Sequence, residues 1–403
     1  MIKRRRGWSG VERNVWYFVQ QAKRKATSVA LSVVGPVRRP PRQSEQRGAA
    51  RVPHGVAASL SRRTQPTPLK TARESETRHR HRASPILRHT RTQPFFCGAA
   101  EMAKVPVIDL RLTGAASPEE SARLREACER LGCFRVTGHG APPELLAEMK
   151  AAVRLLFDLP DDAKRRNTDV IPGSGYVAPS ATNALYEAFG LLDAAAPADV
   201  DAFCARLDAP PGVRETVKAY AEKMHDVIVD VAGKLASSMG LDQEERCSFK
   251  DWPCQFRINK YNYTEDTVGS SGVQVHTDSS FLTVLQEDEC VGGLEVLDPA
   301  TGEFVPVDPV AGSFLINIGD VGTAWSNGRL HNVKHRVRCV APVPRISIAM
   351  FLLAPKDGRV SAPETFVDAD RPRRYKAFNY DDYRRLRMSN GEHAGEALAR
   401  LEA

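Results

Sequence analysis

From Phe256 onward the chain consists of short apolar segments rich in Val, Ile, Leu and Phe, separated by turn residues roughly every ten positions. Regular short strands of this kind are typical of an all-β sandwich or barrel. Eight such segments suit a jelly roll. The expected strands cover residues 256–263, 273–277, 281–286, 294–297, 304–307, 313–318, 332–337 and 345–353.

The residues before Phe256 show mainly helical patterns instead. We expect helices at 118–131, 143–157, 197–207 and 213–239, and Gly240 is a suitable residue to end the last of them. Short strands are expected at 105–109 and 133–137, and a closing helix at 380–402. The predicted fold class is mixed α/β (α+β), with a double-stranded β-helix (jelly-roll) core, a helical N-terminal subdomain and a C-terminal helix.

The net charge of +8 is concentrated in the first hundred residues. Residues 1–101 hold 22 Lys and Arg against 5 Asp and Glu, whereas residues 102–403 hold 35 against 44, a net charge of −9. The body of the protein is therefore not expected to bind nucleic acid. The longest apolar run near the start, residues 29–37, is shorter than the roughly 20 residues that cross a bilayer, so we expect no membrane span.

These patterns divide the chain into four parts. They are a basic, disordered extension at 1–101, a mostly helical region at 102–250, a jelly-roll domain at 251–360 and a helical tail at 361–403. For the extension we favour a spurious upstream reading with the true start at Met102. A transit segment and an RNA- or partner-binding tail remain open. A cytoplasmic location is expected unless the extension is a genuine transit segment, which would make the protein organellar.

The eight cysteines form no CxxC pair and no spacing typical of a zinc finger. A disulfide framework is usual in small secreted chains, and this chain is neither small nor cysteine-dense. We expect the cysteines to be reduced and most of them to pack as small apolar side chains.

A metal-binding pattern lies in the strand-rich half. On a strand, residues i and i+2 point to the same face, so His276 and Asp278 present an imidazole and a carboxylate side by side. A third ligand must come from another strand. His335 is the strong candidate and His331 the weaker one. Two imidazoles and one carboxylate with open positions form the facial triad of non-haem Fe(II) oxygenases.

The same spacing recurs at two further places. Arg345 and Ser347 share a face at the start of an apolar strand, where a buried guanidinium requires an anionic partner. A dicarboxylate cosubstrate such as 2-oxoglutarate supplies that anion and chelates the metal through its 2-oxo acid end. Asn259 and Tyr261 are able to add an amide and a phenol to the anion site, although a satisfied core pair explains them equally.

Taken together, these residues resemble plant Fe(II)- and 2-oxoglutarate-dependent dioxygenases of the isopenicillin-N-synthase-like fold, over residues 105–353. The resemblance implies iron binding by His276, Asp278 and His335, and 2-oxoglutarate binding by Arg345 and Ser347 with help from Tyr261 and Asn259. It also implies O2 as cosubstrate and ascorbate as reductant. The motifs that carry it lie at 106–110, 132–140, 157–160, 275–278, 292–296, 317–320, 325–328, 335–337 and 345–347.

Segments 173–177, 183–190 and 251–257 look like the auxin-oxidising members of that family. This closer likeness implies oxidation of indole-3-acetic acid to 2-oxindole-3-acetic acid by a monomer that binds a small aromatic or hormone-like acid. Four aromatic residues are candidates for the substrate pocket, although single aromatic residues more often belong to a core: Tyr186, Phe189, Phe281 and Phe351.

Three other functions remain open at this point. The first is a dioxygenase of the same fold that acts on another plant metabolite, of the gibberellin, flavonoid or glucosinolate type. The second is an oxidase of the same fold that uses ascorbate and no 2-oxoglutarate. The third is a ligand-binding module without catalysis.

Overall fold

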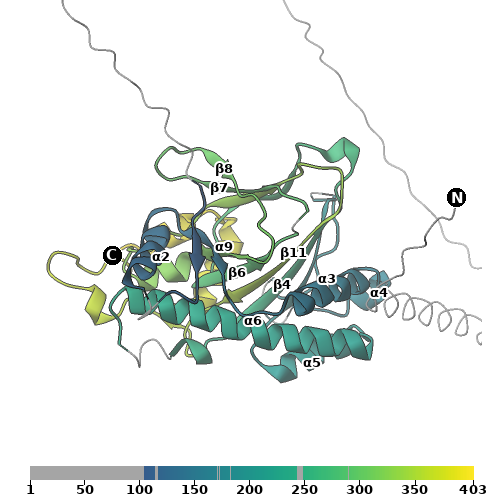
Figure 1. Cartoon of the computed structure of the whole chain (residues 1–403), viewed down its shortest axis with the longest axis horizontal. Coiled ribbons are helices and arrows are strands. Elements are labelled where there is room, and N and C mark those ends of the chain that lie inside the picture. Colours follow the sequence, from purple (N-terminus) through teal and green to yellow (C-terminus); the bar gives the residue numbers. More distant parts are fainter. Residues whose placement is uncertain are drawn as a thin grey trace, which may run out of the picture. The chain divides into compact units, whose positions relative to one another are not determined.

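The computed structural model describes residues 104–113, 117–169, 171, 173–181, 183–242, 248–288 and 290–403 (Figure 1). The predictions for residues 1–101 lie outside these ranges. Within them, two facing β-sheets form the centre, and the longest helix runs along the outer side of the larger sheet (Figure 1). The expected fold class is confirmed.

In the described part of the chain, the larger sheet has seven strands in the order β1-β2-β9-β6-β11-β4-β3. All neighbours are antiparallel except β1 and β2, which are parallel. The strands are β1 (Val107–Asp109), β2 (Cys133–Thr137), β9 (Phe314–Ile318), β6 (Leu282–Gln286), β11 (Arg345–Leu352), β4 (Cys254–Tyr261) and β3 (Tyr186–Leu191).

The smaller sheet has the strand order β5-β10-β7-β8 among the described residues. Its strands are β5 (Ser271–His276), β10 (His335–Arg338), β7 (Leu294–Leu297) and β8 (Phe304–Pro306). A separate short pair joins β12 (Arg359–Val360) to β13 (Phe378–Asn379). The larger sheet thus takes β1, β2 and β3 from the first half of the chain, whereas the smaller sheet comes entirely from the second half.

Helix α6 (Pro211–Ser238) supports the larger sheet from outside through contacts with β6 and β11. Its buried residues recur every three or four positions, which gives the helix one apolar face. Helix α2 (Pro118–Arg130) begins at Ser117, whose hydroxyl accepts the backbone N–H of Glu120 as an N-cap. The other helices are α3 (Pro143–Phe157), α4 (Asp161–Lys164), α5 (Pro197–Arg206), α8 (Asp320–Trp325), α9 (Tyr380–Asn390) and α10 (Glu396–Ala399).

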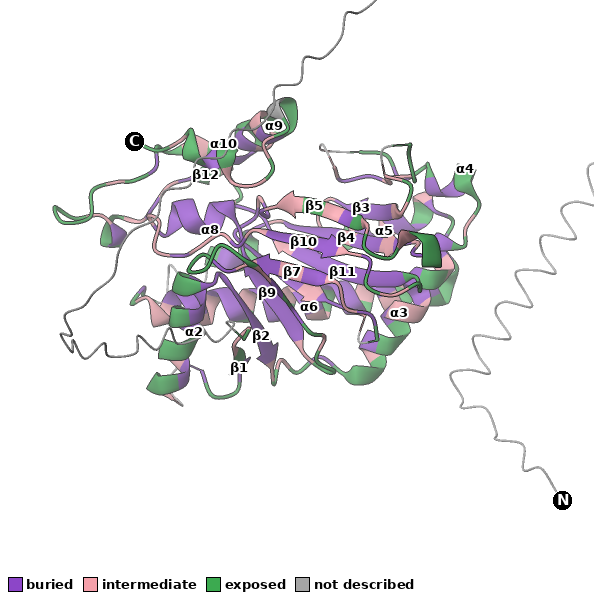
Figure 2. Cartoon of the chain, turned by 90° about the horizontal axis from the view of Figure 1, so that it is seen from above, coloured by how far each residue is buried: buried purple, intermediate pink, exposed green. Residues whose placement is uncertain are grey.

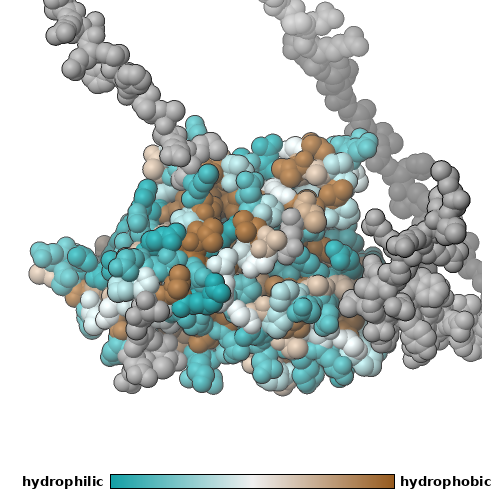
Figure 3. Space-filling model, in the orientation of Figure 1, coloured by the Kyte–Doolittle hydropathy of each residue, from teal (hydrophilic) through white to brown (hydrophobic). Residues whose placement is uncertain are grey.

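Buried residues fill two regions of the core. One lies between the larger sheet and the helices, and Figure 2 shows its strands almost wholly buried. A second, smaller cluster, which includes Tyr261, Leu294 and Val337, joins the two sheets. On the face seen in Figure 3, hydrophilic side chains surround separate hydrophobic patches. In the described part of the chain, no helix has the length and apolar character required to span a bilayer.

Most predicted elements agree with the structure to within two residues at each end. Strands β3, β12 and β13 and helices α4 and α8 are not among the predicted elements. The closing helix is broken at Gly391, whose left-handed backbone (φ 66°) ends α9, before α10 begins at Glu396. Strand β10 begins at His335 rather than at residue 332, so His331 lies outside it. The described cysteines are free thiols, and all of them are buried except Cys290.

The end of the chain is attached to the centre by a buried polar network around Arg387 of α9. Its guanidinium pairs with the fully buried Asp320 and donates to the hydroxyl of Thr277 at 3.1 Å and to its carbonyl at 2.8 Å. Asp320 also accepts from Tyr383 at 2.6 Å and from Asn332 at 2.7 Å. Helix α9 therefore holds the backbone of the 276–278 segment.

We predict that Arg387→Met lowers the free energy of unfolding by about 3 kcal/mol, because it leaves the Asp320 carboxylate buried without its cation. The matched control is Arg385→Met on the same helix. Arg385 pairs with Asp382 on the surface, so its loss should cost less than about 0.5 kcal/mol. Urea unfolding followed by circular dichroism measures both. Equal stabilities of the two variants would contradict this role of Arg387.

Candidate metal centre and anion pocket

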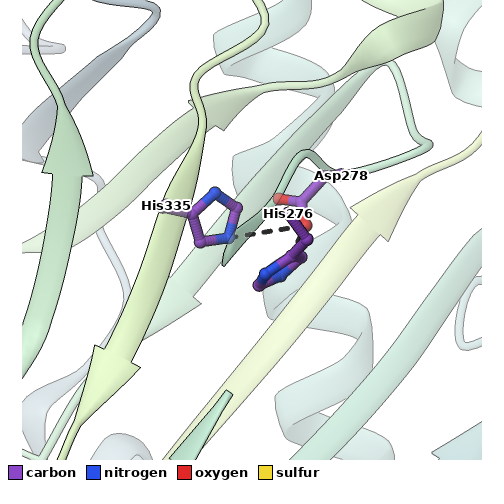
Figure 4. A group of neighbouring side chains, drawn as sticks. All are labelled: His276, Asp278 and His335. Atoms are coloured by element: carbon purple, nitrogen blue, oxygen red, sulfur yellow. Dashed lines mark ion pairs between the residues drawn. The ribbon is translucent and has the colours of Figure 1, made fainter. Parts of the chain in front are cut away.

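Antiparallel pairing of β5 with β10 places His276 directly opposite His335, and the centroids of their rings lie 4.2 Å apart. Asp278 follows two residues after His276, beyond the end of β5. Its Oδ1 lies 3.9 Å from Nε2 of His276 and 3.7 Å from Nε2 of His335. Figure 4 shows the three side chains converging on one space. One ligand atom from each lies within 4.8 Å of the others.

Each of these side chains is oriented by a second contact. Nδ1 of His276 lies 2.8 Å from the Gln274 carbonyl, and Nδ1 of His335 lies 3.2 Å from the Val333 carbonyl. A carbonyl only accepts, so Nδ1 carries the proton and Nε2 offers its lone pair to the shared space. Thr283 donates to Oδ2 of Asp278 at 2.6 Å, which leaves Oδ1 for the same space.

Electrostatics favours a neutral imidazole at His276. Desolvation and the neighbouring His335 lower the pKa of His276 to about 4. The contact of the His276 ring with Asp278 at neutral pH is therefore an approach of potential ligand atoms rather than an ion pair. Two imidazoles and one carboxylate, each fixed by a further hydrogen bond, fit a divalent metal of the Fe(II) type. Among the described residues, no other group of His, Cys, Asp or Glu side chains converges in this way.

A cavity of about 280 Å³ extends from this triad between the sheets. The register of the larger sheet aligns Tyr186, Tyr261 and Arg345 in one row across β3, β4 and β11, and Asn259 with Ser347 in the next row. All five residues line the cavity. The i, i+2 pattern on two neighbouring strands thus produces one polar surface, and the structure brings all the predicted metal and cosubstrate residues to a single cavity.

Arg345 is only 1% exposed, and none of its three guanidinium nitrogens has a hydrogen-bond partner within the protein. The nearest carboxylate, that of Glu287, is 3.6 Å from Nη2, which is too far for a hydrogen bond. The ring of Tyr261 lies 5.2 Å from the guanidinium carbon. A buried cation without a hydrogen bond is costly, so the cavity is suited to an anion at this point.

The neighbours of Arg345 form a short hydrogen-bonded chain. Tyr186 donates to the side-chain Oδ1 of Asn259 at 2.7 Å, and the side-chain Nδ2 of Asn259 lies 3.4 Å from the Ser347 hydroxyl. Burial raises the pKa of Tyr261 to about 12, so its phenol remains protonated and able to donate. These hydrogen bonds fix an amide and a hydroxyl group beside the guanidinium of Arg345.

Of the four aromatic pocket candidates, the structure brings only Tyr186 and Phe351 to the cavity. Phe189 lies three residues after Tyr186 on β3 and therefore faces the opposite side, where it packs against Phe157 and Phe203. Phe281 is fully buried in an aromatic cluster with Phe249, Trp252 and Trp325. The predicted pocket roles of Phe189 and Phe281 are wrong.

The sequence interpretation missed further polar residues that line the cavity, among them Gln255, Arg257 and Arg384. Gln255 and Arg257 continue the alternation of Asn259 and Tyr261 along β4, so extending the same pattern would have found them. Arg257 donates to the Gly173 carbonyl at 2.6 Å. Arg384 comes from α9 and donates to Gln255 at 2.9 Å, a contact across 129 residues that no local pattern indicates.

Comparison with known proteins agrees with this geometry. Residues 252–354 match the family model of the 2OG-Fe(II) oxygenase superfamily, and residues 105–189 match that of the non-haem dioxygenase in morphine synthesis N-terminal domain. The sequence is 77% identical to the 2-oxoglutarate-dependent dioxygenase DAO of Oryza sativa over 303 residues, which cover 75% of this chain and all of that protein. The chain belongs to the 2OG-Fe(II) oxygenase superfamily.

Solved structures of this superfamily also resemble the chain in fold. The crystal structure of the dioxygenase for auxin oxidation in rice superposes with a TM-score of 0.70 at 76% identity, covering 74% of this chain and all of that one. The dioxygenase for auxin oxidation 1 from Arabidopsis thaliana, in its binary complex with 2-oxoglutarate, gives 0.64 at 50% identity, covering 67% of this chain and all of that one. The chain is an oxidoreductase of the 2-oxoglutarate-dependent dioxygenase class, as expected.

We predict that His335→Ala and Asp278→Ala each weaken binding of Mn(II), used as an air-stable substitute for Fe(II), by more than about 100-fold. Loss of a residue that only orients a ligand typically costs 10–100-fold, and loss of a ligand itself costs more. Calorimetric titration measures the Kd. The control is His331→Ala, because His331 lies outside β10 and outside the cavity. Mn(II) binding that weakened equally in all three variants would refute the assignment.

Proposed function

We propose that this chain oxidises indole-3-acetic acid (auxin) to 2-oxindole-3-acetic acid in auxin catabolism, using Fe(II), 2-oxoglutarate and O2. The observation that supports 2-oxoglutarate as cosubstrate is the buried guanidinium of Arg345, which has no hydrogen-bond partner within the protein and lies in the cavity of the metal triad. The substrate rests on the 77% identity to the rice enzyme and on the name of the structural neighbour, a dioxygenase for auxin oxidation.

In this proposal His276, Asp278 and His335 hold the iron. When bound, Fe(II) supplies the redox chemistry that couples oxidative decarboxylation of 2-oxoglutarate to succinate with oxidation of the substrate. The three protein ligands lie on one side, which leaves the other positions to the cosubstrate and O2. Ascorbate serves as the reductant that keeps the iron in its ferrous state.

The distal carboxylate of 2-oxoglutarate pairs with Arg345 and accepts the hydroxyl of Ser347. Tyr261 and Asn259 fix the position of these two groups, since Tyr261 packs beside the guanidinium and Asn259 contacts Ser347. The contacts of both Nδ1 atoms with backbone carbonyls turn the two Nε2 atoms toward the metal. This arrangement disfavours an oxidase of the same fold that uses ascorbate and no 2-oxoglutarate, because such an enzyme would leave the buried Arg345 guanidinium without a hydrogen bond.

Beyond the cosubstrate, Tyr186 and Phe351 offer flat surfaces to an indole ring, and Arg257 lies on the same side of the β4 strand as Asn259. A cation and aromatic rings around one space suit a small aromatic acid. We further propose that the protein acts as a cytoplasmic monomer.

We predict that Arg345→Met raises the KM for 2-oxoglutarate by about 100-fold or more, since a desolvated charge pair contributes several kcal/mol to binding. Ser347→Ala removes one hydrogen bond and should raise it by about 10-fold at most. Succinate formation at varied 2-oxoglutarate concentration measures both. If Arg345→Met leaves the KM for 2-oxoglutarate unchanged, 2-oxoglutarate does not bind at this site.

The substrate is tested with the full chain, Fe(II), 2-oxoglutarate and ascorbate, offered indole acids, gibberellins and flavonoids in parallel. We expect 2-oxindole-3-acetic acid and succinate in equal amounts from indole-3-acetic acid. The control is the Asp278→Ala variant, which should form neither product. If a gibberellin or flavonoid is oxidised in preference to the indole acid, the auxin assignment is wrong.

A further inference from the structure

Arg135 lies in the 132–140 motif of the sequence, yet the proposed reaction gives it no role. It projects from β2, and its side chain is only 3% exposed. Its Nη2 lies 2.7 Å from Oε2 of Glu287 and also donates to the Asp308 carbonyl, while its Nη1 donates to the Ser313 hydroxyl at 3.3 Å. Arg135 is thus fixed on several sides and holds Glu287 by one carboxylate oxygen.

The other oxygen of Glu287 lies beside Arg345. Oε1 is buried, accepts no hydrogen bond within the protein, and lies 3.6 Å from Nη2 of Arg345. Glu287 therefore sits between two buried guanidiniums, but it hydrogen-bonds only to Arg135. With all three groups ionised the cluster carries one net positive charge, which is the charge that a single incoming carboxylate neutralises.

We propose that Arg135 is a positioning residue that keeps the guanidinium of Arg345 free to bind the cosubstrate. By holding Glu287, it prevents that carboxylate from closing onto Arg345, so the guanidinium of Arg345 remains available to the distal carboxylate of 2-oxoglutarate. This inference rests on the proposed function.

The physical reason is competition between two carboxylates for one cation. A buried carboxylate that loses its partner must find another cation, and for Glu287 the next guanidinium is that of Arg345. A small movement of the Glu287 carboxylate toward Arg345 would produce a charge-assisted hydrogen bond between these two side chains. An internal competitor is present at high effective concentration, so 2-oxoglutarate would have to displace it at a loss of affinity.

The test measures the Kd for 2-oxoglutarate by calorimetry in the presence of Mn(II) and without O2, so no substrate or turnover is involved. We expect Arg135→Met to weaken 2-oxoglutarate binding by about 10–100-fold, and Arg135→Lys, which keeps the charge but offers one ammonium, by about 3–10-fold. The decisive variant is Arg135→Met combined with Glu287→Gln. It removes the freed carboxylate and should restore binding to within about 3-fold of the wild-type Kd.

The matched control is Lys164→Met. Lys164 forms a similarly buried pair with Glu187 at 2.7 Å, but in the described part of the chain it is Glu287, not Glu187, that lies beside Arg345. This variant should lose stability while its Kd for 2-oxoglutarate stays unchanged. A purely structural role of Arg135 predicts instead that affinity falls only in proportion to the unfolded fraction, which thermal melts of each variant report.

Three outcomes separate the hypotheses. Wild-type protein that binds Mn(II) but not 2-oxoglutarate refutes the proposed function itself. If the wild type binds and both Arg135 variants bind equally well, the positioning role is wrong. If the double variant binds as weakly as Arg135→Met, Glu287 is not the competitor and the inference is also wrong. Should Arg135→Met fail to fold, Arg135→Lys alone and combined with Glu287→Gln give the same comparison.

Discussion

A guanidinium group buried without a hydrogen bond is unfavourable unless an anion reaches it, and this condition organises the space between the two sheets. Arg345 carries such a group at the start of β11, in the cavity of the metal triad. Tyr261, Asn259 and Ser347 surround it with groups that donate or orient. A dicarboxylate that also chelates a metal would satisfy both ends of this cavity at once, which supports our proposal that the anion site and the triad serve one reaction.

The precision of both sites depends on strand register. His276 and His335 face each other because β5 and β10 pair at these residues, and Arg345 and Ser347 meet Tyr261 and Asn259 because β11 and β4 pair in the same way. A shift of one residue would turn each of these side chains to the opposite face. Helix α9 adds to this order, since Arg387 fixes Thr277 between His276 at the end of β5 and Asp278 just beyond it.

Much of this was predictable from the chain alone, because the side-chain period of a strand is two residues. His276 with Asp278, Asn259 with Tyr261, and Arg345 with Ser347 were each assigned to one face before any partner was known. The spacing of the apolar segments also indicated the jelly roll. Where the same rule was not applied, the prediction failed: Phe189 lies an odd number of residues from Tyr186 and so faces the core.

The sequence by itself thus determined which side chains share a strand face, and it indicated His276, Asp278 and His335 as candidate metal ligands, with His331 as a weaker alternative. Tertiary structure decided which faces meet. Arg135 reaches Glu287 across 152 residues, Arg384 reaches Gln255 across 129, and Arg387 reaches Thr277 across 110. Contacts this distant follow from how sheets and helices pack, and local periodicity carries no information about them. For that reason only the folded chain shows that Arg345 lacks a hydrogen bond and that Arg135 pairs with Glu287.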